Sequence, residues 1–394
     1  MKNIFLVTFV PILFFGIVFY VAPFVTKKTF NENSVMEGRE NLTQNSQGLA
    51  SDSKISHIDT PYPLYGAYFS SWASGSQMFR KKMNELFETK GINAVVIDVK
   101  DSTGRIGYIP STENLLEIGS GENRISDIDA FIEELHKKNI YVIGRVAVFQ
   151  DNYLARKRPD LALLQTGTQK PWADKHNLAW LDPGSQEVWE YVLEVADEAY
   201  KRGFDEINFD YIRFPSDGAT KKYTRQFNSE LPLPEVLKKF FAYVDTKVGE
   251  KYPISFDIFG MTTTAEDDMG IGQLYEDIIV HGDYIMPMVY PSHYGAGLFG
   301  FLNPAEHPYE VVSQAMSSAV LRAQNVQMPK EKLRTWIQDF DLGATYDSKK
   351  VLDQMNATTS VGVPSWVLWD AANTYTKEAI LEFQKLKQSN PQTD

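Results

Sequence analysis

Short apolar strands alternate with helical stretches eight times after Pro61, and this alternation limits the possible folds more than any other feature. The strands are predicted at residues 65–71, 94–100, 141–149, 204–215, 254–260, 283–290, 334–340 and 365–370. A longer segment, residues 150–185, interrupts the alternation. Alternating strands and helices without an internal repeat indicate a parallel sheet. Eight such units favour a closed (β/α)8 TIM barrel of the α/β class over the alternative, a doubly wound sheet with an extra lobe.

The N-terminal part of the chain has a different composition. Residues 4–25 form an apolar run, close to the roughly 20 residues that cross a bilayer. We expect residues 1–28 to be a signal anchor or a cleaved signal peptide, 29–60 to be a disordered linker, and 61–390 to be the barrel. The barrel is then expected outside the cytoplasm, tethered to the cell membrane by a single span or secreted.

Composition excludes several classes of function. The formal net charge of −12 argues against a nucleic-acid partner, which normally requires a basic surface. The absence of cysteine removes thiol catalysis, disulfides and thiolate zinc sites. The six histidines lack a metal-ligand spacing such as His-Glu-x-x-His, so neither a metal nor another cofactor is expected.

The fourth predicted strand carries the most informative residue, Asp210. Residues 204–215 read as a buried strand in which Asp210 stands between aromatic neighbours. An ionised carboxylate in such apolar surroundings needs partners, and Arg213 and Arg145 are the candidates. Pro215 ends the strand where a loop would begin. A strand that ends in a carboxylate, a basic residue and a proline is typical of the C-terminal end of a parallel barrel. The active sites of TIM-barrel enzymes lie at that end.

Other predicted strands also end in polar and aromatic residues. The candidate substrate-binding residues are Asp98, Lys100, Arg145, Arg213, Tyr290 and Trp369. The candidate catalytic residues are Asp210, Asp257 and Asp339. Aromatic rings beside carboxylates suit sugars, and two carboxyl groups are what cleavage of a glycosidic bond requires. Asp210 and Asp257, on neighbouring strands, form the predicted pair.

The same motifs resemble a known family. Residues 65–370 resemble a bacterial family catalogued as Putative glycosyl hydrolase domain, formerly a domain of unknown function. The resemblance is carried by residues 93–101, 144–145, 208–215, 286–292 and 366–370. More distantly, the chain resembles the α-amylase-related barrels. That second resemblance implies Asp210 as nucleophile, Asp257 as acid/base and Asp339 as stabiliser of the transition state.

The chain departs from the amylase pattern at two places. Asn208 stands where that pattern has Arg, and Asp257 stands where it has Glu. The acidic run 266–268 therefore remains an alternative source of the acid, and retention or inversion of configuration stays open. The run 286–290 also resembles the chitinase-type barrels, in which a Tyr at this strand end, here Tyr290, assists an acetamido group.

Three functions follow from these patterns. The first is a glycoside hydrolase or transglycosylase that acts on an extracellular or cell-wall polysaccharide. The second is a barrel that binds glycan without cleaving it and associates with the cell wall. A hydrolase of ester or amide bonds is a third option, and no Gly-x-Ser-x-Gly motif supports it.

Overall fold

The computed structural model describes residues 56–218 and 222–389, and eight parallel strands in them close into a barrel. The order around the barrel is β1-β10-β9-β8-β7-β5-β3-β2. The strands are β1 (Tyr65–Phe69), β2 (Ala94–Lys100), β3 (Tyr141–Ala147), β5 (Glu206–Asp210), β7 (Ile254–Phe259), β8 (Tyr284–Val289), β9 (Thr335–Gln338) and β10 (Trp366–Trp369). Each predicted strand coincides with one of them, so the predicted (β/α)8 barrel is confirmed.

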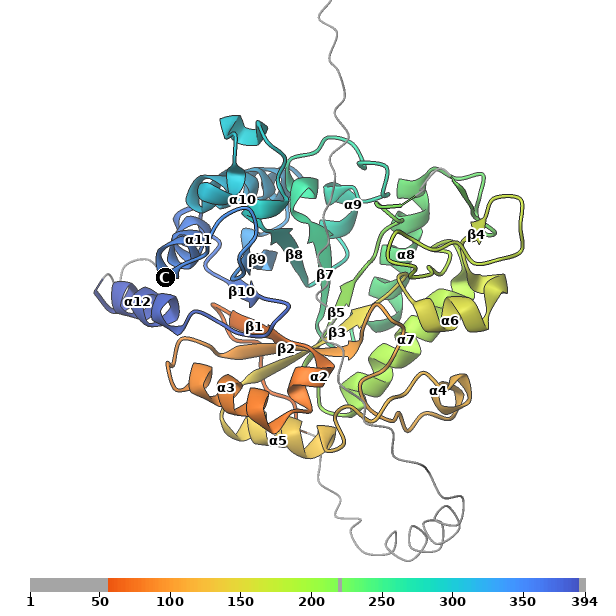
Figure 1. Ribbon diagram of the computed structural model, residues 1–394, viewed down its shortest axis with the longest axis horizontal. Coiled ribbons are helices and arrows are strands. Elements are labelled where there is room, and N and C mark those ends of the chain that lie inside the picture. Colours follow the sequence, from red (N-terminus) through yellow and green to blue (C-terminus); the bar gives the residue numbers. More distant parts are fainter. Residues whose placement is uncertain (1–55, 219–221, 390–394) are drawn as a thin grey trace, which may run out of the picture. The chain divides into compact units, whose positions relative to one another are not determined.

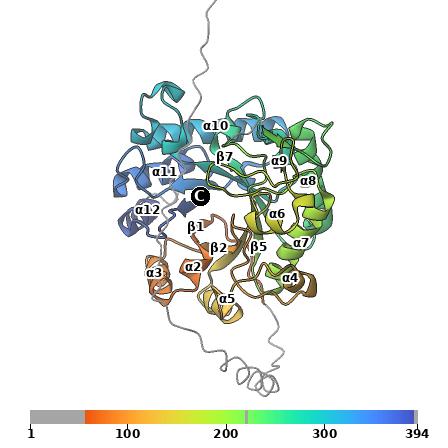
Figure 2. The same ribbon diagram turned by 45° about the vertical axis from the view of Figure 1, so that its right-hand side comes forward.

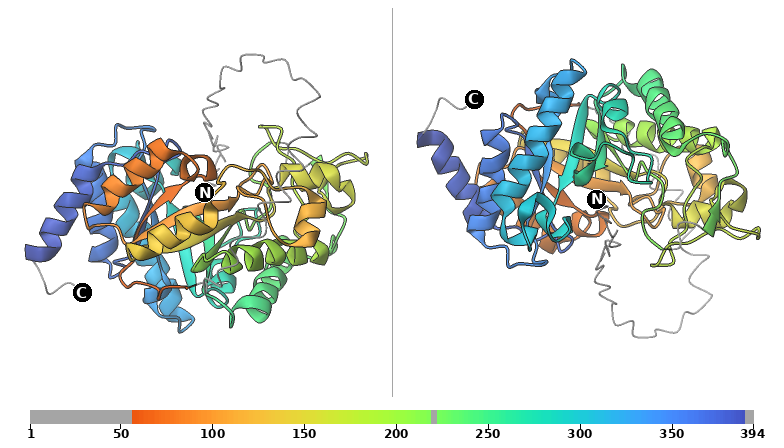
Figure 3. Two further views of the ribbon diagram at one scale, coloured as in Figure 1. Left: turned by 90° about the horizontal axis from the view of Figure 1, so that it is seen from below. Right: turned by 90° about the horizontal axis from the view of Figure 1, so that it is seen from above.

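Helices surround the barrel strands, as Figures 1 and 2 show and as the two views of Figure 3 repeat from below and above. They are α2 (Ser71–Ser74), α3 (Gln77–Phe87), α4 (Glu113–Ile118), α5 (Ile128–Lys137), α6 (Asn152–Lys157), α7 (Gln186–Lys201), α8 (Leu233–Val248), α9 (Tyr275–Ile279), α10 (Pro308–Asn325), α11 (Ser348–Ser360) and α12 (Lys377–Ser389). The longer ones are amphipathic, and their buried residues cover the outer face of the barrel.

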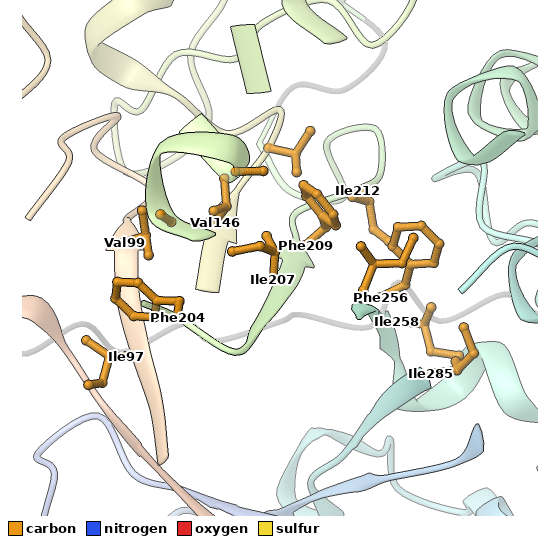
Figure 4. Packing of buried hydrophobic residues seen from close by; sticks show 14 of the residues in the cluster. Ile97, Val99, Val146, Phe204, Ile207, Phe209, Ile212, Phe256, Ile258 and Ile285 are labelled. Carbon is orange, nitrogen blue, oxygen red and sulfur yellow. The ribbon is translucent and has the colours of Figure 1, made fainter. Parts of the chain in front are cut away.

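Strand β5 shows how sequence alternation aims the side chains. Ile207 and Phe209 pack on the helix side of the sheet, among the buried residues drawn in Figure 4. Asn208 and Asp210 therefore point to the barrel interior, because successive side chains of a strand face opposite sides. The polar residues of this strand are thus delivered to the barrel axis.

A buried ion pair closes the end of the barrel where the strands begin. Arg334 Nη1 lies 2.9 and 2.8 Å from the two carboxylate oxygens of Glu206, and the Tyr141 hydroxyl donates to Glu206 Oε2 at 3.1 Å. The Arg334 guanidinium also lies 3.2 Å from the ring centroid of Tyr284. Because packed side chains fill this end, any site inside the barrel must open at the other end.

A small second sheet links the loops after β3 and β5. Strands β4 (Leu164–Gln165) and β6 (Tyr223–Thr224) pair antiparallel within the two insertions. The Asp182 carboxylate accepts hydrogen bonds from the backbone N–H groups of Gly184 and Phe227. The long segment 150–185 is therefore ordered by contacts with the chain that follows Asp210.

The predicted apolar segment 4–25 and most of the predicted linker lie outside the described residues. Within residues 56–218 and 222–389, no helix combines the length and hydropathy that a membrane crossing needs. The end of the predicted linker contacts the barrel: Ile58 N donates to Asp205 Oδ1 at 2.9 Å, and the hydroxyls of Thr60 and Tyr141 lie 2.8 Å apart.

Candidate active site

Arg145 holds together the carboxylates at the C-terminal ends of β2 and β5. Its Nη1 donates to Asp98 Oδ1 at 2.6 Å, and its Nε donates to Asp210 Oδ2 at 3.1 Å. Nη2 also pairs with Asp210. The Tyr68 hydroxyl donates to the second Asp98 oxygen at 2.6 Å. Sequence analysis named Arg213 and Arg145 as candidate partners of Asp210. In the structure, Arg145 forms the ion pair.

Asp210 and Asp257 face each other across neighbouring strands. Phe209 lies opposite Phe256 in the β5–β7 ladder, so the next residue of each strand, Asp210 and Asp257, stands at the same level. Arg145 Nε lies 3.1 Å from Asp210 Oδ2 and 3.9 Å from Asp257 Oδ2, so these two oxygens cannot be farther apart than the sum, 7.0 Å. The predicted pair is thus brought into one cluster.

Asp257 is anchored through one of its two oxygens. Its Oδ1 accepts hydrogen bonds from Asn208 Nδ2 at 2.9 Å and from Trp336 Nε1 at 2.7 Å. Burial, reinforced by the charge of Asp210, raises the pKa of Asp257 well above its usual range, although Arg145 and the two hydrogen bonds act in the opposite direction. Because both N–H donors occupy Oδ1, a proton bound by Asp257 belongs on Oδ2, the oxygen near Arg145 and Asp210.

This group of contacts, here called the Arg145 cluster, contains three carboxyl groups and one guanidinium. Its members are Arg145, Asp98, Asp210, Asp257, Tyr68, Asn208 and Trp336. Burial raises the pKa of Asp98, while Arg145 and the Tyr68 hydrogen bond oppose that rise. Burial lowers the pKa of Arg145, but the charges of Asp210 and Asp98 outweigh burial and raise it. One guanidinium therefore pairs directly with Asp98 and Asp210 and lies farther from Asp257. A proton held by one of the carboxyl groups balances the remaining negative charge.

Aromatic rings form the wall on the β8, β10 and β1 side. Tyr290 stacks on Trp369 with ring centroids 5.4 Å apart, and Tyr68 stacks on Trp369 at 6.3 Å. Phe340 meets the Trp369 ring edge-on at 5.1 Å. Burial raises the pKa of Tyr290, and the charges of Asp257 and Asp210 raise it further, so its hydroxyl keeps its proton and remains a donor. The predicted residues Tyr290 and Trp369 therefore lie together beside the carboxylates.

The backbone is strained directly after Asp210. Tyr211 has a φ of +53°, a left-handed conformation that costs a bulky residue about 1–3 kcal/mol. Its backbone N–H donates to the Asp210 side chain. Strain of this kind persists only where surrounding contacts impose it, and it is concentrated at functional sites.

Two predicted substrate-binding residues do not contact the Arg145 cluster directly. Lys100 has no exposed side-chain surface, and its Nζ pairs with the equally buried Asp151 at 2.7 Å. Substrate contact by Lys100 would require this pair to open. Arg213 lies near Asp210 in sequence but donates to the carbonyl oxygen of Phe214 at 3.1 Å.

Asp339 is held in a separate set of contacts. Its two carboxylate oxygens accept from the backbone N–H of Thr376 at 2.8 Å and from the Thr376 hydroxyl at 2.7 Å, immediately before α12. Burial raises the pKa of Asp339 to about 7, against the two Thr376 hydrogen bonds, and the acidic neighbours that add to the rise are Asp370 and Asp341. The carboxylates of Asp210 and Asp257 are not among these neighbours.

Asp339 gives the protein a pH-dependent stability. Its folded-state pKa lies above that of an unfolded Asp, so the folded state binds more protons between pH 4 and 7, and stability falls as pH rises through that range. One such group contributes a slope of at most about 1.4 kcal/mol per pH unit. We expect Asp339→Asn to reduce the negative slope, measured by urea unfolding at pH 5, 6, 7 and 8. An unchanged slope would contradict the raised pKa.

The acidic run 266–268, the alternative source of the acid, forms a loop. Asp268 accepts hydrogen bonds from the N–H groups of Gly270 and Gly272, and Asp267 accepts one from Met269 N. Glu266 and Asp267 are exposed. In the described part of the chain, no group of three or more acidic or histidine side chains is arranged to hold a metal ion.

Three residues of the cluster were not among the predicted site residues. Tyr68 binds Asp98, while Asn208 and Trp336 anchor Asp257. The sequence could have indicated Asn208, because it stands two residues before Asp210 and therefore on the same face of the strand. Tyr68 and Trp336 read as ordinary core residues, since a ring inside a strand is usually packing material.

A family comparison covers most of the barrel. The model of the family described as Putative glycosyl hydrolase domain matches residues 66–375. Among curated proteins, none matches the sequence.

Solved structures show similarity to the fold. The α-L-fucosidase isoenzyme 2 from Paenibacillus thiaminolyticus has a TM-score of 0.55 at 11% identity, over 83% of this chain and 49% of that chain. The α-galactosidase TtGalA from Thermus thermophilus, in complex with stachyose, has a TM-score of 0.50 at 13% identity, over 84% and 66%. A hypothetical protein from Ruminiclostridium thermocellum ATCC 27405 is 36% identical over 48% of this chain and 96% of that chain, with a TM-score of 0.45.

Proposed function

The chain belongs to the family described as Putative glycosyl hydrolase domain, and we propose that it cleaves O-glycosidic bonds with the carboxyl groups of Asp210 and Asp257. The observation that carries the proposal is the pairing of these two groups around Arg145, one in an ion pair and the other with a raised pKa. Glycosidic cleavage uses two carboxyl groups, one that carries the proton for the leaving oxygen and one that acts as nucleophile or base.

The two groups take complementary roles in this proposal. Asp257 donates the proton on Oδ2 to the glycosidic oxygen as the bond to the anomeric carbon breaks. Asp210 either attacks the anomeric carbon or removes a proton from the attacking water. The limit of 7.0 Å between their Oδ2 atoms is compatible with a retaining pair at about 5–5.5 Å and with a close inverting pair at about 6.5 Å.

The surrounding residues support binding of a sugar. Arg145 fixes the Asp210 carboxylate, and the Tyr290 hydroxyl is a donor for sugar oxygens. Trp369 is partly exposed and offers an apolar surface for a sugar ring. Asp339 and Lys100 remain predictions without a role in this mechanism.

The proposed substrate is a polysaccharide outside the cytoplasm, such as a cell-wall or capsule polymer. This part of the proposal is supported by the apolar run 4–25, which suits an anchor or a signal segment. Membrane fractionation of cells that produce the full chain, before and after a carbonate wash, would separate an anchored protein from a secreted one.

A glycan-binding barrel without hydrolysis is the second candidate. The observation that favours it is the burial of Asp257, whose side chain is only 1% exposed, compared with 8% for Asp210. An acid must reach the bond it protonates. If the buried Asp257 cannot reach the glycosidic bond, the Arg145 cluster would bind the sugar and would not cleave it.

A panel of polysaccharides tests the proposal through the release of new reducing ends. We expect Asp257→Asn to slow hydrolysis of a natural glycan about 10²-fold, because the amide has no proton to give at this position. An aryl glycoside of the same sugar, whose leaving group needs no proton, should lose less than about tenfold. Release of no reducing ends from any glycan that binds would favour the second candidate.

A further inference from the structure

Arg213 is a buried guanidinium without an acidic partner. The residue is 8% exposed, and its Nη1 donates to the carbonyl oxygen of Phe214 at 3.1 Å. Throughout residues 56–218 and 222–389, no Asp or Glu oxygen lies within 4.0 Å of its nitrogens. Arg145 and Arg334 differ from Arg213, because each of them holds a carboxylate oxygen at 2.9 Å or less.

The acidic groups nearest to Arg213 have other partners. Asp174 accepts hydrogen bonds from Gln150 Nε2 at 2.8 Å and from Trp180 Nε1 at 3.2 Å. Asp217 lies 3.4 Å from Lys175 Nζ. Burial lowers the pKa of Arg213, and Tyr211 together with the charges of Asp210, Asp217 and Asp174 only partly offsets that effect. A guanidinium nevertheless keeps its proton in proteins, so a buried positive charge remains without a direct counter-ion.

Three aromatic rings fix the position of this charge. The guanidinium carbon of Arg213 lies 4.5 Å from the ring centroid of Phe259, 5.0 Å from Trp180 and 5.4 Å from Tyr211. These rings come from the end of β7, from the insertion after β3 and from the residue after Asp210. Because Nη1 bonds to Phe214, the Nε and Nη2 edge remains, and this edge matches the two oxygens of a carboxylate.

We propose that Arg213 binds a sugar carboxylate, so the substrate is an acidic glycan that contains uronic acid or another carboxylate-bearing sugar. The inference rests on the proposed function in taking the ligand to be a glycan. The ring centroid of Tyr211 lies 5.4 Å from the guanidinium carbon of Arg213 and 5.9 Å from that of Arg145, the ion partner of Asp210, so the acidic sugar would be bound near the glycosidic bond that is cleaved. The substrate carboxylate then supplies the missing counter-ion and makes two charge-assisted hydrogen bonds.

Binding calorimetry tests the proposal independently of hydrolysis. The Asp257→Asn protein is titrated with oligomers of galacturonic acid, glucuronic acid or muramic acid and with the same oligomers after reduction of the carboxyl to an alcohol. We expect at least one acidic oligomer to bind about 10- to 100-fold more tightly than its reduced counterpart. Equal affinity in every pair, or binding of no acidic oligomer, would overturn the proposal. A sulfated oligomer that binds when carboxylated ones do not would overturn the choice of carboxylate.

Two Arg213 variants and one control locate the effect. Arg213→Gln should remove the preference for the acidic oligomer, and Arg213→Lys should keep only part of it, because Lys lacks the two-pronged edge. Lys170→Gln removes the same charge from an exposed position in the insertion after β3 and should leave the preference intact. A preference that survives in a folded Arg213→Gln protein would contradict the role of Arg213. If that protein does not fold, Arg213→Lys and the comparison of oligomers still decide.

The two proposals fail in different ways. Tight binding of acidic oligomers without hydrolysis by the wild type would leave the role of Arg213 standing and would reject the hydrolase. Hydrolysis of neutral glycans that is insensitive to Arg213→Gln would do the reverse.

Discussion

The Asp210→Asn variant is expected to lose at least about 10³-fold in kcat/KM toward the polysaccharide while it remains folded. The amide has nearly the same shape as the carboxylate and still accepts a hydrogen bond from Arg145, so the Arg145 cluster can persist. It cannot form a bond to the anomeric carbon or take a proton from water, and one of these steps is required in either stereochemical course. Initial rates of reducing-end release, with thermal unfolding recorded alongside, measure both parts of the expectation.

Asp283→Asn is the matched control for this variant. Asp283 is a carboxylate at the start of β8, at the opposite end of the barrel, where its Oδ2 accepts a hydrogen bond from Ile254 N at 2.9 Å. We expect this variant to hydrolyse the polysaccharide at nearly the wild-type rate. A loss that is equally large in both variants would mean that general destabilisation, and not the Asp210 carboxylate, explains the result.

Replacement of Arg145 by Leu is expected to lower the free energy of unfolding by about 3–5 kcal/mol at pH 7. Asp98 and Asp210, with side chains 4% and 8% exposed, would then be buried without their counter-ion. The cost should shrink as the pH falls toward 4, because a protonated Asp98 needs no positive partner. Urea unfolding of the variant and of the wild type at pH 7 and pH 4.5 measures the difference.

The partly exposed pair of Arg105 and Glu122 provides the comparison for Arg145. Its Nε–Oε1 distance is 3.2 Å, but the side chains are 30% and 36% exposed. Arg105→Leu should cost no more than about 1 kcal/mol, since water screens such a pair. If Arg145→Leu cost no more than this control, the Arg145 cluster would not be an electrostatic unit.

The fold could be predicted because each barrel strand leaves a clear local pattern. In β5, large apolar residues alternate with Asn208 and Asp210, and the same period of two sets which face each residue occupies. Strands β4 and β6 were not predicted. Each has two residues, and they pair across 58 and 60 positions of the chain, so nothing local marks them.

The candidate site was predictable only in part. The position of Asp210 and Asp257 at neighbouring strand ends follows from the strand order, whereas the choice of ion partner does not. Arg213 is near Asp210 in the chain, but the turn at Tyr211 carries it away, and Arg145 reaches Asp210 from the adjacent strand. The roles of Asp98 and Trp336 depend on side-chain contacts between strands, which only the three-dimensional structure reveals.

The structure of the Asp257→Asn protein with a bound oligosaccharide tests most directly whether Asp210 and Asp257 act on one bond. Our account predicts a glycosidic oxygen within about 2.6–3.2 Å of the residue 257 side chain, with the anomeric carbon facing Asp210. An oligosaccharide bound across Trp369 and Tyr290, with residue 257 still buried beneath Arg145 and out of reach, would contradict it.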